Sequence, residues 1–308
     1  MRRVVGTLTT IPPKYVNCNK LLDSLKSLNN QTYKLDKIYL TLPYRCERLN
    51  IDYPDVSEEI KSLCTIVRCH DYGPITKLMG ALMMEDEDVV IFSCDDDMIY
   101  HKNTVEKLME KINLYPNCAI GSTGFLLKNT FPNCSYYNNM NFFGHNLINF
   151  NVNKNGRYVD SLFGFSGILY FRRFFPKKDN LYEDFIKLSL SHDDLKSNDD
   201  IYISGWLSSK KIKRIVFNDI PKIDFSTIHR QKTDISADNI KFVKKLNSSI
   251  LISKSIGFYK TVEPIYYYET ITFKTIFLIS IILIIIILIY NYNYINYLYI
   301  QGFPSFNI

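Results

Sequence analysis

The sequence lacks the features that define several large protein classes. Its 7 cysteines include no CxxC pair, which argues against zinc ribbons and disulfide frameworks, and free thiols suit a reducing compartment. A GxxxxGK loop followed by Ser or Thr is absent, which excludes the P-loop class of phosphate-binding proteins. The net charge is only +6, and the lysines are spread along the chain, so we expect no nucleic-acid partner. Arg2 and Arg3 lead into a short apolar stretch that Pro12 and Pro13 interrupt, so we expect no signal peptide.

One long hydrophobic run stands out near the C-terminus. Residues 275–290 read TIFLISIILIIIILIY, and no charged residue follows Lys274. A bilayer needs about 20 apolar residues in a helix, so we predict a single-pass transmembrane helix over 271–290, with a buried core helix as the alternative. A short aromatic and Asn-rich tail, 291–308, follows it. Lysines precede the run and none follow it, which by the positive-inside rule places residues 1 to about 270 in the cytoplasm.

Apolar periodicity predicts alternating strands and helices along residues 1–265, which we expect to form one domain. This order is typical of a doubly wound α/β domain. The poorly periodic stretch 129–157 is expected to be a loop, a lid over a site, or an insertion. Strands are predicted at 3–10, 37–42, 65–67, 89–92, 119–124, 159–171 and 212–217, and helices at 19–28, around 60–63, and at 75–84, 104–113 and 197–209.

The most informative motif is an acidic triplet after an apolar run. Val89–Phe92 is apolar throughout, as in a strand buried on both faces, and Asp95, Asp96 and Asp97 follow almost at once. Ligands of open α/β sheets bind at the carboxyl ends of strands, and crowded carboxylates repel one another unless a cation lies among them. Oxygen ligands favour Mg²⁺ or Mn²⁺. The alternative is a solvated acidic turn or a cap for the next helix.

A second set of candidate residues lies further along the chain. Gly164 and Gly167 fall inside the strand-like stretch 159–171, where a glycine marks a bulge, a turn or a close approach to a ligand. Asp199 and Asp200 open the helix that follows, either as helix-capping residues or with Asp200 as a general base. The neighbouring pair Asp193–Asp194 competes for the same roles.

Taken in order, these segments resemble glycosyltransferases of the GT-A fold, the family-2-like members of the nucleotide-diphospho-sugar transferase superfamily. Asp95 and Asp97 look like the Asp-x-Asp motif of that superfamily. The resemblance runs from about residue 4 to residue 230. The other segments that carry it are Thr9-Thr10-Ile11-Pro12, Ser27-Leu28-Asn29-Asn30-Gln31-Thr32, the strand IYLTLP, Asp71-Tyr72-Gly73-Pro74 with Thr76-Lys77, Gly164-Phe165-Ser166-Gly167, and Asp199-Asp200-Ile201-Tyr202-Ile203-Ser204.

The resemblance implies an enzyme with a mixed α/β sheet flanked by helices. It implies transfer of a sugar, with inversion, from a UDP- or GDP-sugar to an acceptor hydroxyl on a glycan, protein or lipid, assisted by Mn²⁺ or Mg²⁺. Lys77 is either a charge near the donor phosphates or an exposed helix lysine. The implied roles are donor binding by Thr9, Asp71, Lys77, Asp95 and Asp96, metal binding by Asp95, Asp97 and His229, general base catalysis by Asp200, and an acceptor side formed by Gly164, Gly167 and Asp199.

Two other interpretations remain open at this point. The chain is alternatively a membrane-anchored binding or scaffold protein on a catalytically inactive version of the same fold. It is also compatible with a different metal-dependent phosphoryl or nucleotidyl transferase, a class that donor hydrolysis products would separate from glycosyltransferases.

Overall fold

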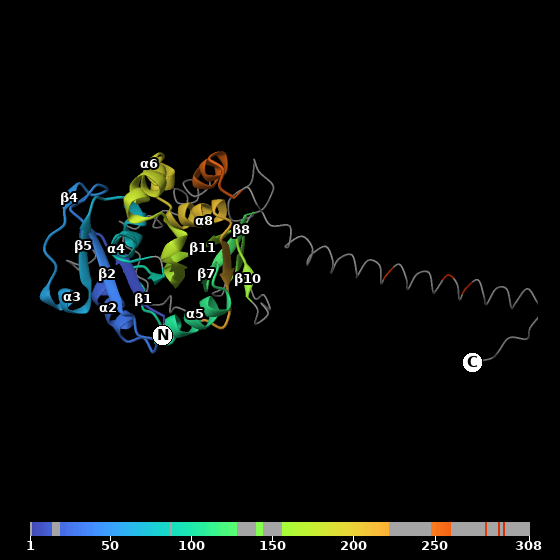
Figure 1. The fold of residues 1–308 in the computed structure, drawn as a ribbon, viewed down its shortest axis with the longest axis horizontal. Coiled ribbons are helices and arrows are strands. Elements are labelled where there is room, and N and C mark those ends of the chain that lie inside the picture. The colour runs from blue at the N-terminus through green and yellow to red at the C-terminus, as the bar shows by residue number, and fades with distance from the viewer. Residues whose placement is uncertain are drawn as a thin grey trace, which may run out of the picture. The chain divides into compact units, whose positions relative to one another are not determined.

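A computed structural model divides the chain into two units, Met1–Lys260 and Thr261–Ile308. Figure 1 shows the first unit as a sheet flanked by helices. Only isolated positions of the second unit are described. The described residues are 2–13, 19–86, 88–127, 140–143, 156–221, 248–259, 281, 289 and 292.

The centre of the first unit is an eight-stranded mixed sheet of order β10-β13-β7-β12-β6-β1-β2-β5. The strands β5, β2, β1 and β6 are parallel to one another, β12 is antiparallel to both β6 and β7, β13 is parallel to β7, and β10 is antiparallel to β13. The bounds are β1 Val4–Thr9, β2 Lys37–Pro43, β5 Thr65–Cys69, β6 Val90–Ser93, β7 Cys118–Gly121, β10 Arg157–Tyr158, β12 Ile168–Phe171 and β13 Lys213–Val216.

Helices and two small sheets complete the described part of this unit. The helices are α2 Lys20–Asn29, α3 Glu58–Leu63, α4 Thr76–Met84, α5 Thr104–Leu114, α6 Lys187–Leu190, α7 Asp193–Lys196 and α8 Asp199–Ser209. Single turns lie at Gly73–Ile75, Gly164–Ser166, Arg172–Phe174 and Lys178–Asn180, and a π-helical segment at Tyr182–Ile186. The small sheets pair β3 Arg45–Cys46 with β4 Ile51–Asp52, and β8 Gly124–Leu127 with β9 Met140–Phe143 and β11 Ser161–Leu162.

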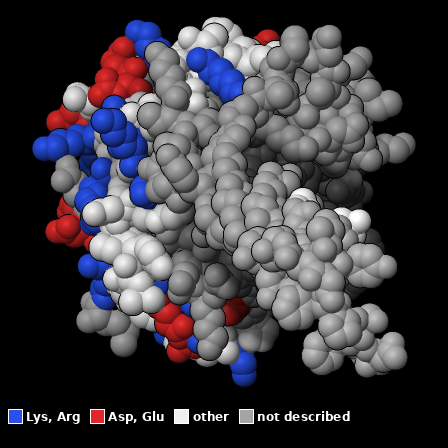
Figure 2. Space-filling model, turned by 90° about the vertical axis from the view of Figure 1, so that its right-hand side faces the viewer, with Lys and Arg blue, Asp and Glu red and all other residues white. Residues whose placement is uncertain are grey.

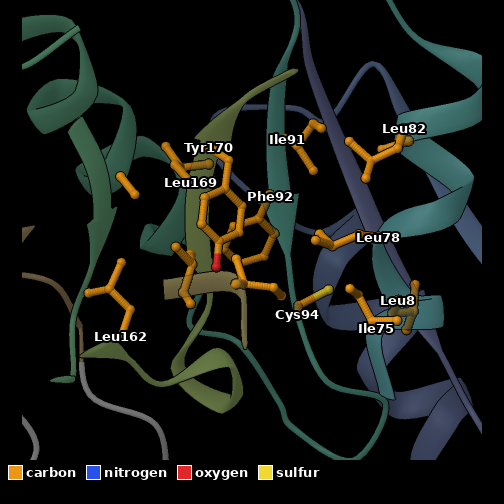
Figure 3. Close-up of a cluster of buried hydrophobic side chains, with 14 of the residues drawn as sticks. Leu8, Ile75, Leu78, Leu82, Ile91, Phe92, Cys94, Leu162, Leu169 and Tyr170 are labelled. Atoms are coloured by element: carbon orange, nitrogen blue, oxygen red, sulfur yellow. The ribbon is translucent and has the colours of Figure 1, made fainter. Parts of the chain in front are cut away.

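The central strands are apolar on both faces because helices cover both sides of the sheet. Ile91 and Phe92 of β6 are fully buried, and Figure 3 shows them beside Leu78 and Leu82 of α4 and Leu169 of β12. Cys94 is fully buried in the same cluster, and burial raises the pKa of its thiol. The apolar core therefore extends to the residue before the acidic triplet.

Helix α4 lies unusually close to the sheet. A Cβ atom at Gly80 would lie 2.6 Å from Tyr39 Cβ, so only glycine permits this approach. The Gly80 N–H donates to Thr41 Oγ1 at 2.9 Å, and Thr7 Oγ1 donates to the Lys77 carbonyl at 2.5 Å. These contacts fix the first turn of α4 above the carboxyl ends of β1 and β2.

The mixed α/β sheet predicted from the sequence is confirmed, and in the strand-like stretch predicted at 159–171 the glycines mark a turn. The turn separates two strands, because β11 pairs with β8 and β12 pairs with β6 and β7. Gly167 ends the turn with φ of +82°, a conformation that glycine adopts without strain. The two glycines therefore mark the place where the chain leaves one sheet for another.

The C-terminal transmembrane helix in the predicted fold class is a second correction. A span requires a continuous apolar helix of about 20 residues. Among the described residues, the longest helices contain 11 residues, and none is long and apolar enough to cross a membrane. The segment 271–290 lies outside the described residues, apart from Ile281 and Ile289. The anchor, the membrane partner and the single-pass localisation inferred from that segment are therefore not supported.

Charged side chains of both signs are mixed on the described surface. Figure 2 shows Lys and Arg lying among Asp and Glu on one face. Several form exposed ion pairs within one helix, such as Lys61 with Glu58 and Lys107 with Glu110. Such pairs contribute about 0.2–1 kcal/mol each, so they are solubilising more than stabilising features.

Candidate active site

The order of the strands reverses between β1 and β6, and such a switch point is a common place for ligand binding. From β1 the chain adds β2 and β5 on one side, and then returns to add β6 on the other. In open α/β sheets, ligands bind at the carboxyl ends of the strands at such a switch point. Thr9 ends β1 and Thr10 follows it at this edge, and Asp95 and Asp97 follow β6.

A buried ion-pair cluster occupies the same edge. Lys77, in the first turn of α4, has a side chain only 8% exposed. Its Nζ lies 2.9 Å from Asp95 Oδ1 and 2.6 Å from Asp199 Oδ2, so one ammonium joins the acidic turn after β6 to the start of α8. The alternative of an exposed helix lysine is wrong.

Electrostatics keep this lysine charged. Burial alone would lower the pKa of Lys77, but the carboxylates of Asp199, Asp95 and Asp200 together hold its pKa well above the usual value. The pKa of Asp200 is raised well above its ordinary value, first by burial and then by the negative charge of Asp199, against the opposing effects of Lys77 and a backbone N–H. Asp200 retains some solvent exposure although protein atoms surround most of it.

Gly164 closes the cluster from the other side. Its backbone N–H donates to Asp200 Oδ1 at 2.9 Å. A Cβ atom there would lie 2.5 Å from Lys77 Nζ and 2.8 Å from Asp200 Oδ1, so the position has no room for a side chain. Gly167, by contrast, lies against the ring of Phe92 and shapes the turn. The structure thus brings Gly164, Asp199 and Asp200 together with Lys77 and Asp95.

Tyr100 ties the acidic turn to the glycine segment, and sequence reasoning missed it. Its hydroxyl accepts the Asp95 N–H at 2.9 Å and donates to the Phe165 carbonyl at 3.1 Å. The ring is buried and packs edge-on against Phe92, with 5.4 Å between ring centroids. The only signal in the sequence was a tyrosine shortly after the triplet, which is indistinguishable from an ordinary core aromatic.

Asp71, for which the sequence predicts a donor-binding role, makes two hydrogen bonds to backbone groups. Its Oδ1 accepts the Gly73 N–H at 2.8 Å, and its Oδ2 accepts the Glu47 N–H at 2.9 Å. Both carboxylate oxygens therefore bind backbone groups. This is the side-chain-to-backbone bonding by which Asp commonly fixes turns.

Two other predicted donor-binding side chains also make bonds within the protein. Asp96 is buried and accepts a short hydrogen bond from the Thr10 hydroxyl. The Thr9 hydroxyl donates to the Thr41 carbonyl at 2.7 Å, which joins β1 to β2. These bonds hold the edge of the sheet in shape around the cluster.

Two of the three predicted metal ligands, Asp95 and Asp97, belong to the described residues. Asp95 has a side chain 33% exposed, Asp97 is partly buried, and His229 lies outside the described residues. Among the described residues, no three His, Cys, Asp or Glu side chains gather into a group that holds a metal by itself. Mg²⁺ is usually bound through one or two carboxylates together with substrate phosphates. Asp95 and Asp97 supply two partly exposed carboxylates, the ligand type that such a shared ion uses.

Comparisons with known proteins give a likeness of fold only. The sequence matches no family model and no curated protein. Among solved structures, the chain is similar to the 2-C-methyl-D-erythritol 4-phosphate cytidylyltransferase of Francisella tularensis, with 15% sequence identity and a TM-score of 0.41. The match covers 78% of this chain and 99% of that chain. At this identity and score, the likeness carries no conclusion about site or activity.

Proposed function

We propose that this protein transfers a glycosyl group from a UDP- or GDP-sugar to an acceptor hydroxyl, with inversion, in a reaction assisted by Mn²⁺ or Mg²⁺. The observation that carries the proposal is the buried Lys77 ammonium held between Asp95 and Asp199 at the switch point of the sheet. Buried charge clusters with strongly shifted pKa values are characteristic of functional sites.

The donor side of the proposed site lies after β6. Asp95 and Asp97 would hold the divalent ion, with His229 as a further predicted ligand. When bound, such an ion stabilises the negative charge that grows on a departing diphosphate. Lys77 adds a positive charge at the same edge, and its backbone carbonyl is held by the Thr7 hydroxyl.

The acceptor side lies at the start of α8. Asp200 is the proposed general base, which accepts the proton of the acceptor hydroxyl as that oxygen attacks the sugar. Burial and the charge of Asp199 raise the pKa of this carboxyl group, which makes its ionised form a stronger proton acceptor. The Gly164 N–H orients the Asp200 carboxyl group by a hydrogen bond. Asp199 forms an ion pair with Lys77.

A donor screen of the full chain tests the proposal. UDP- and GDP-sugars are incubated with the protein and Mn²⁺, and release of UDP or GDP is measured with and without candidate acceptor sugars. Release that depends on Asp200 and on the divalent ion supports glycosyl transfer. Release of pyrophosphate from a nucleoside triphosphate would instead indicate a nucleotidyl transferase. Binding of UDP with Mn²⁺ but no turnover of any donor would favour the inactive binding protein.

A further inference from the structure

Lys77 is held from two directions, so its ammonium has a defined position. Its carbonyl accepts the Thr7 hydroxyl at 2.5 Å, which fixes the backbone on β1. Its Nζ contacts Asp95 and Asp199, which belong to separate segments of the chain. The lysine is therefore a bridge between the proposed donor side and the proposed acceptor side.

The cluster holds more negative than positive groups. Asp95, Asp199 and Asp200 all act on the single ammonium of Lys77. Carboxylates that are buried together without enough positive charge are unstable in their ionised form. A further cation that reaches the cluster is therefore attracted to it.

Asp95 is the carboxylate through which such a cation enters. Its side chain is 33% exposed, whereas that of Asp199 is 14% exposed and that of Lys77 is 8% exposed. A divalent ion bound by Asp95 would lie next to the ammonium that already contacts Oδ1 of the same group. The two positive charges repel each other strongly in this partly desolvated setting.

We propose that Lys77 is a built-in counter-ion that a divalent cation displaces from Asp95, so that cation binding moves the ammonium wholly onto Asp199 and Asp200. Lys77 is then a positioning residue. Binding of the divalent ion on the donor side changes, through Lys77, the arrangement of Asp199 and Asp200 on the acceptor side. The inference rests on the proposed function in assigning the divalent ion to Asp95. It does not require that transfer be detected.

Binding of Mn²⁺ alone, without any donor, tests the first half of the inference. The free-ion signal in electron paramagnetic resonance gives the affinity of the full-length protein and of its variants. Lys77→Met removes the competing ammonium, so we expect Mn²⁺ to bind about tenfold more tightly, within the usual range of coupling between two ligands. Lys77→Arg keeps the charge and is expected to stay near the wild-type affinity. Lys107→Met, at an exposed lysine paired with Glu110, is the matched control and should change nothing.

Displacement of the Lys77 ammonium from Asp95 is tested on the wild-type protein, so the result does not depend on how a Lys77 variant folds. The ammonium resonance of Lys77 is followed by ¹⁵N nuclear magnetic resonance during titration with Mg²⁺. We expect it to shift in the wild type and to stay unchanged in Asp95→Asn. An unchanged or weaker Mn²⁺ affinity in Lys77→Met, or a Lys77 resonance that ignores Mg²⁺, would overturn the inference. Tighter Mn²⁺ binding without turnover of any donor would leave the inference standing while the proposed function fails.

Discussion

The backbone N–H of Gly164 donates a 2.9 Å hydrogen bond to Asp200 Oδ1, so a residue without a side chain orients the proposed base. In Asp200→Asn the amide keeps an oxygen for this bond but cannot take a proton. We expect turnover to fall about 100-fold or more, with UDP binding retained. Initial rates and UDP titrations measure this. Asp194→Asn, in the competing acidic pair on α7, should keep most of the activity; a larger loss there would mean that Asp194 is the base.

The raised pKa of Asp200 has a consequence for stability. Because its pKa in the folded protein lies above the ordinary value of 3.8, the folded state holds this proton more firmly than the unfolded chain does. The resulting stability is fully present below pH 3.8 and is lost as the pH rises toward the folded pKa. Asp200→Asn stays neutral, so we expect it to unfold at a higher temperature than the wild type at about pH 8, with the difference shrinking toward about pH 4.

Thermal unfolding at several pH values checks this expectation. Asp52→Asn is the control, because it removes one exposed carboxylate that pairs with Arg45 far along the chain from the cluster. If Asp200→Asn is less stable than the wild type at every pH, its carboxylate is a net stabilising group and the electrostatic account of the cluster is incorrect.

Asp96 and Asp97 are neighbours with opposite expected phenotypes. Asp97→Ala should abolish metal-dependent transfer and leave the unfolding temperature close to that of the wild type, because Asp97 is a proposed ligand in a surface turn. Asp96→Ala removes the acceptor of the buried Thr10 hydroxyl and should cost about 1–3 kcal/mol in free energy of unfolding. Denaturant unfolding and Mn²⁺-dependent release of UDP or GDP separate the two effects. Near-normal transfer in Asp97→Ala would remove Asp97 from the metal site.

The strands that position the site were predictable because their patterns are local. The apolar run Val89–Phe92 predicted an interior strand, and β6 lies between β1 and β12 in the middle of the sheet. The helix period of residues 75–84 likewise predicted α4. The glycines at 164 and 167 indicated a bulge, a turn or a close approach to a ligand, but the choice among these depends on which distant strands β11 and β12 join.

The chemistry of the site was less predictable because it depends on partners far away in the sequence. A lysine in the first turn of a helix looks exposed until Asp95 and Asp199 are known to meet it. In the same way, the bonds that Asp71 and Asp96 make to nearby protein groups could not be read from the sequence, and their donor-binding roles stay predictions. Residue type and spacing predicted which segments converge, whereas the partners of each carboxylate depend on contacts that are distant in the sequence.

Gly164→Ala tests the tight closure of the cluster. The new Cβ would lie 2.5 Å from Lys77 Nζ, so the lysine or the glycine segment must move. We expect a loss of about 1–3 kcal/mol in free energy of unfolding and a fall in turnover as Asp200 is displaced. Gly6→Ala is the control, because its Cβ would meet the end of the Leu35 side chain at 3.0 Å and lie in ordinary contact with Ile38 at 3.5 Å. Equal effects of both substitutions on turnover would show that Gly164 has no special relation to the site.

Tyr100→Phe tests the link between the acidic turn and the glycine segment. It removes one hydroxyl and leaves the Asp95 N–H and the Phe165 carbonyl without that partner, at about 1–3 kcal/mol for a buried group left unpaired. Packing of the ring against Phe92 is preserved, so the change isolates the hydrogen bonds.

Tyr39→Phe supplies the matched control for Tyr100→Phe. Its hydroxyl is also buried, but it donates to Glu85 at 2.6 Å, at the C-terminal end of α4, while Lys77 lies in the first turn of that helix. Both variants should lose stability in denaturant unfolding. Only Tyr100→Phe should also weaken Mn²⁺ binding, because only its hydroxyl holds the turn that carries Asp95. If Tyr39→Phe weakens Mn²⁺ binding as much, the effect is a general loosening of the sheet rather than a loss of the turn's position.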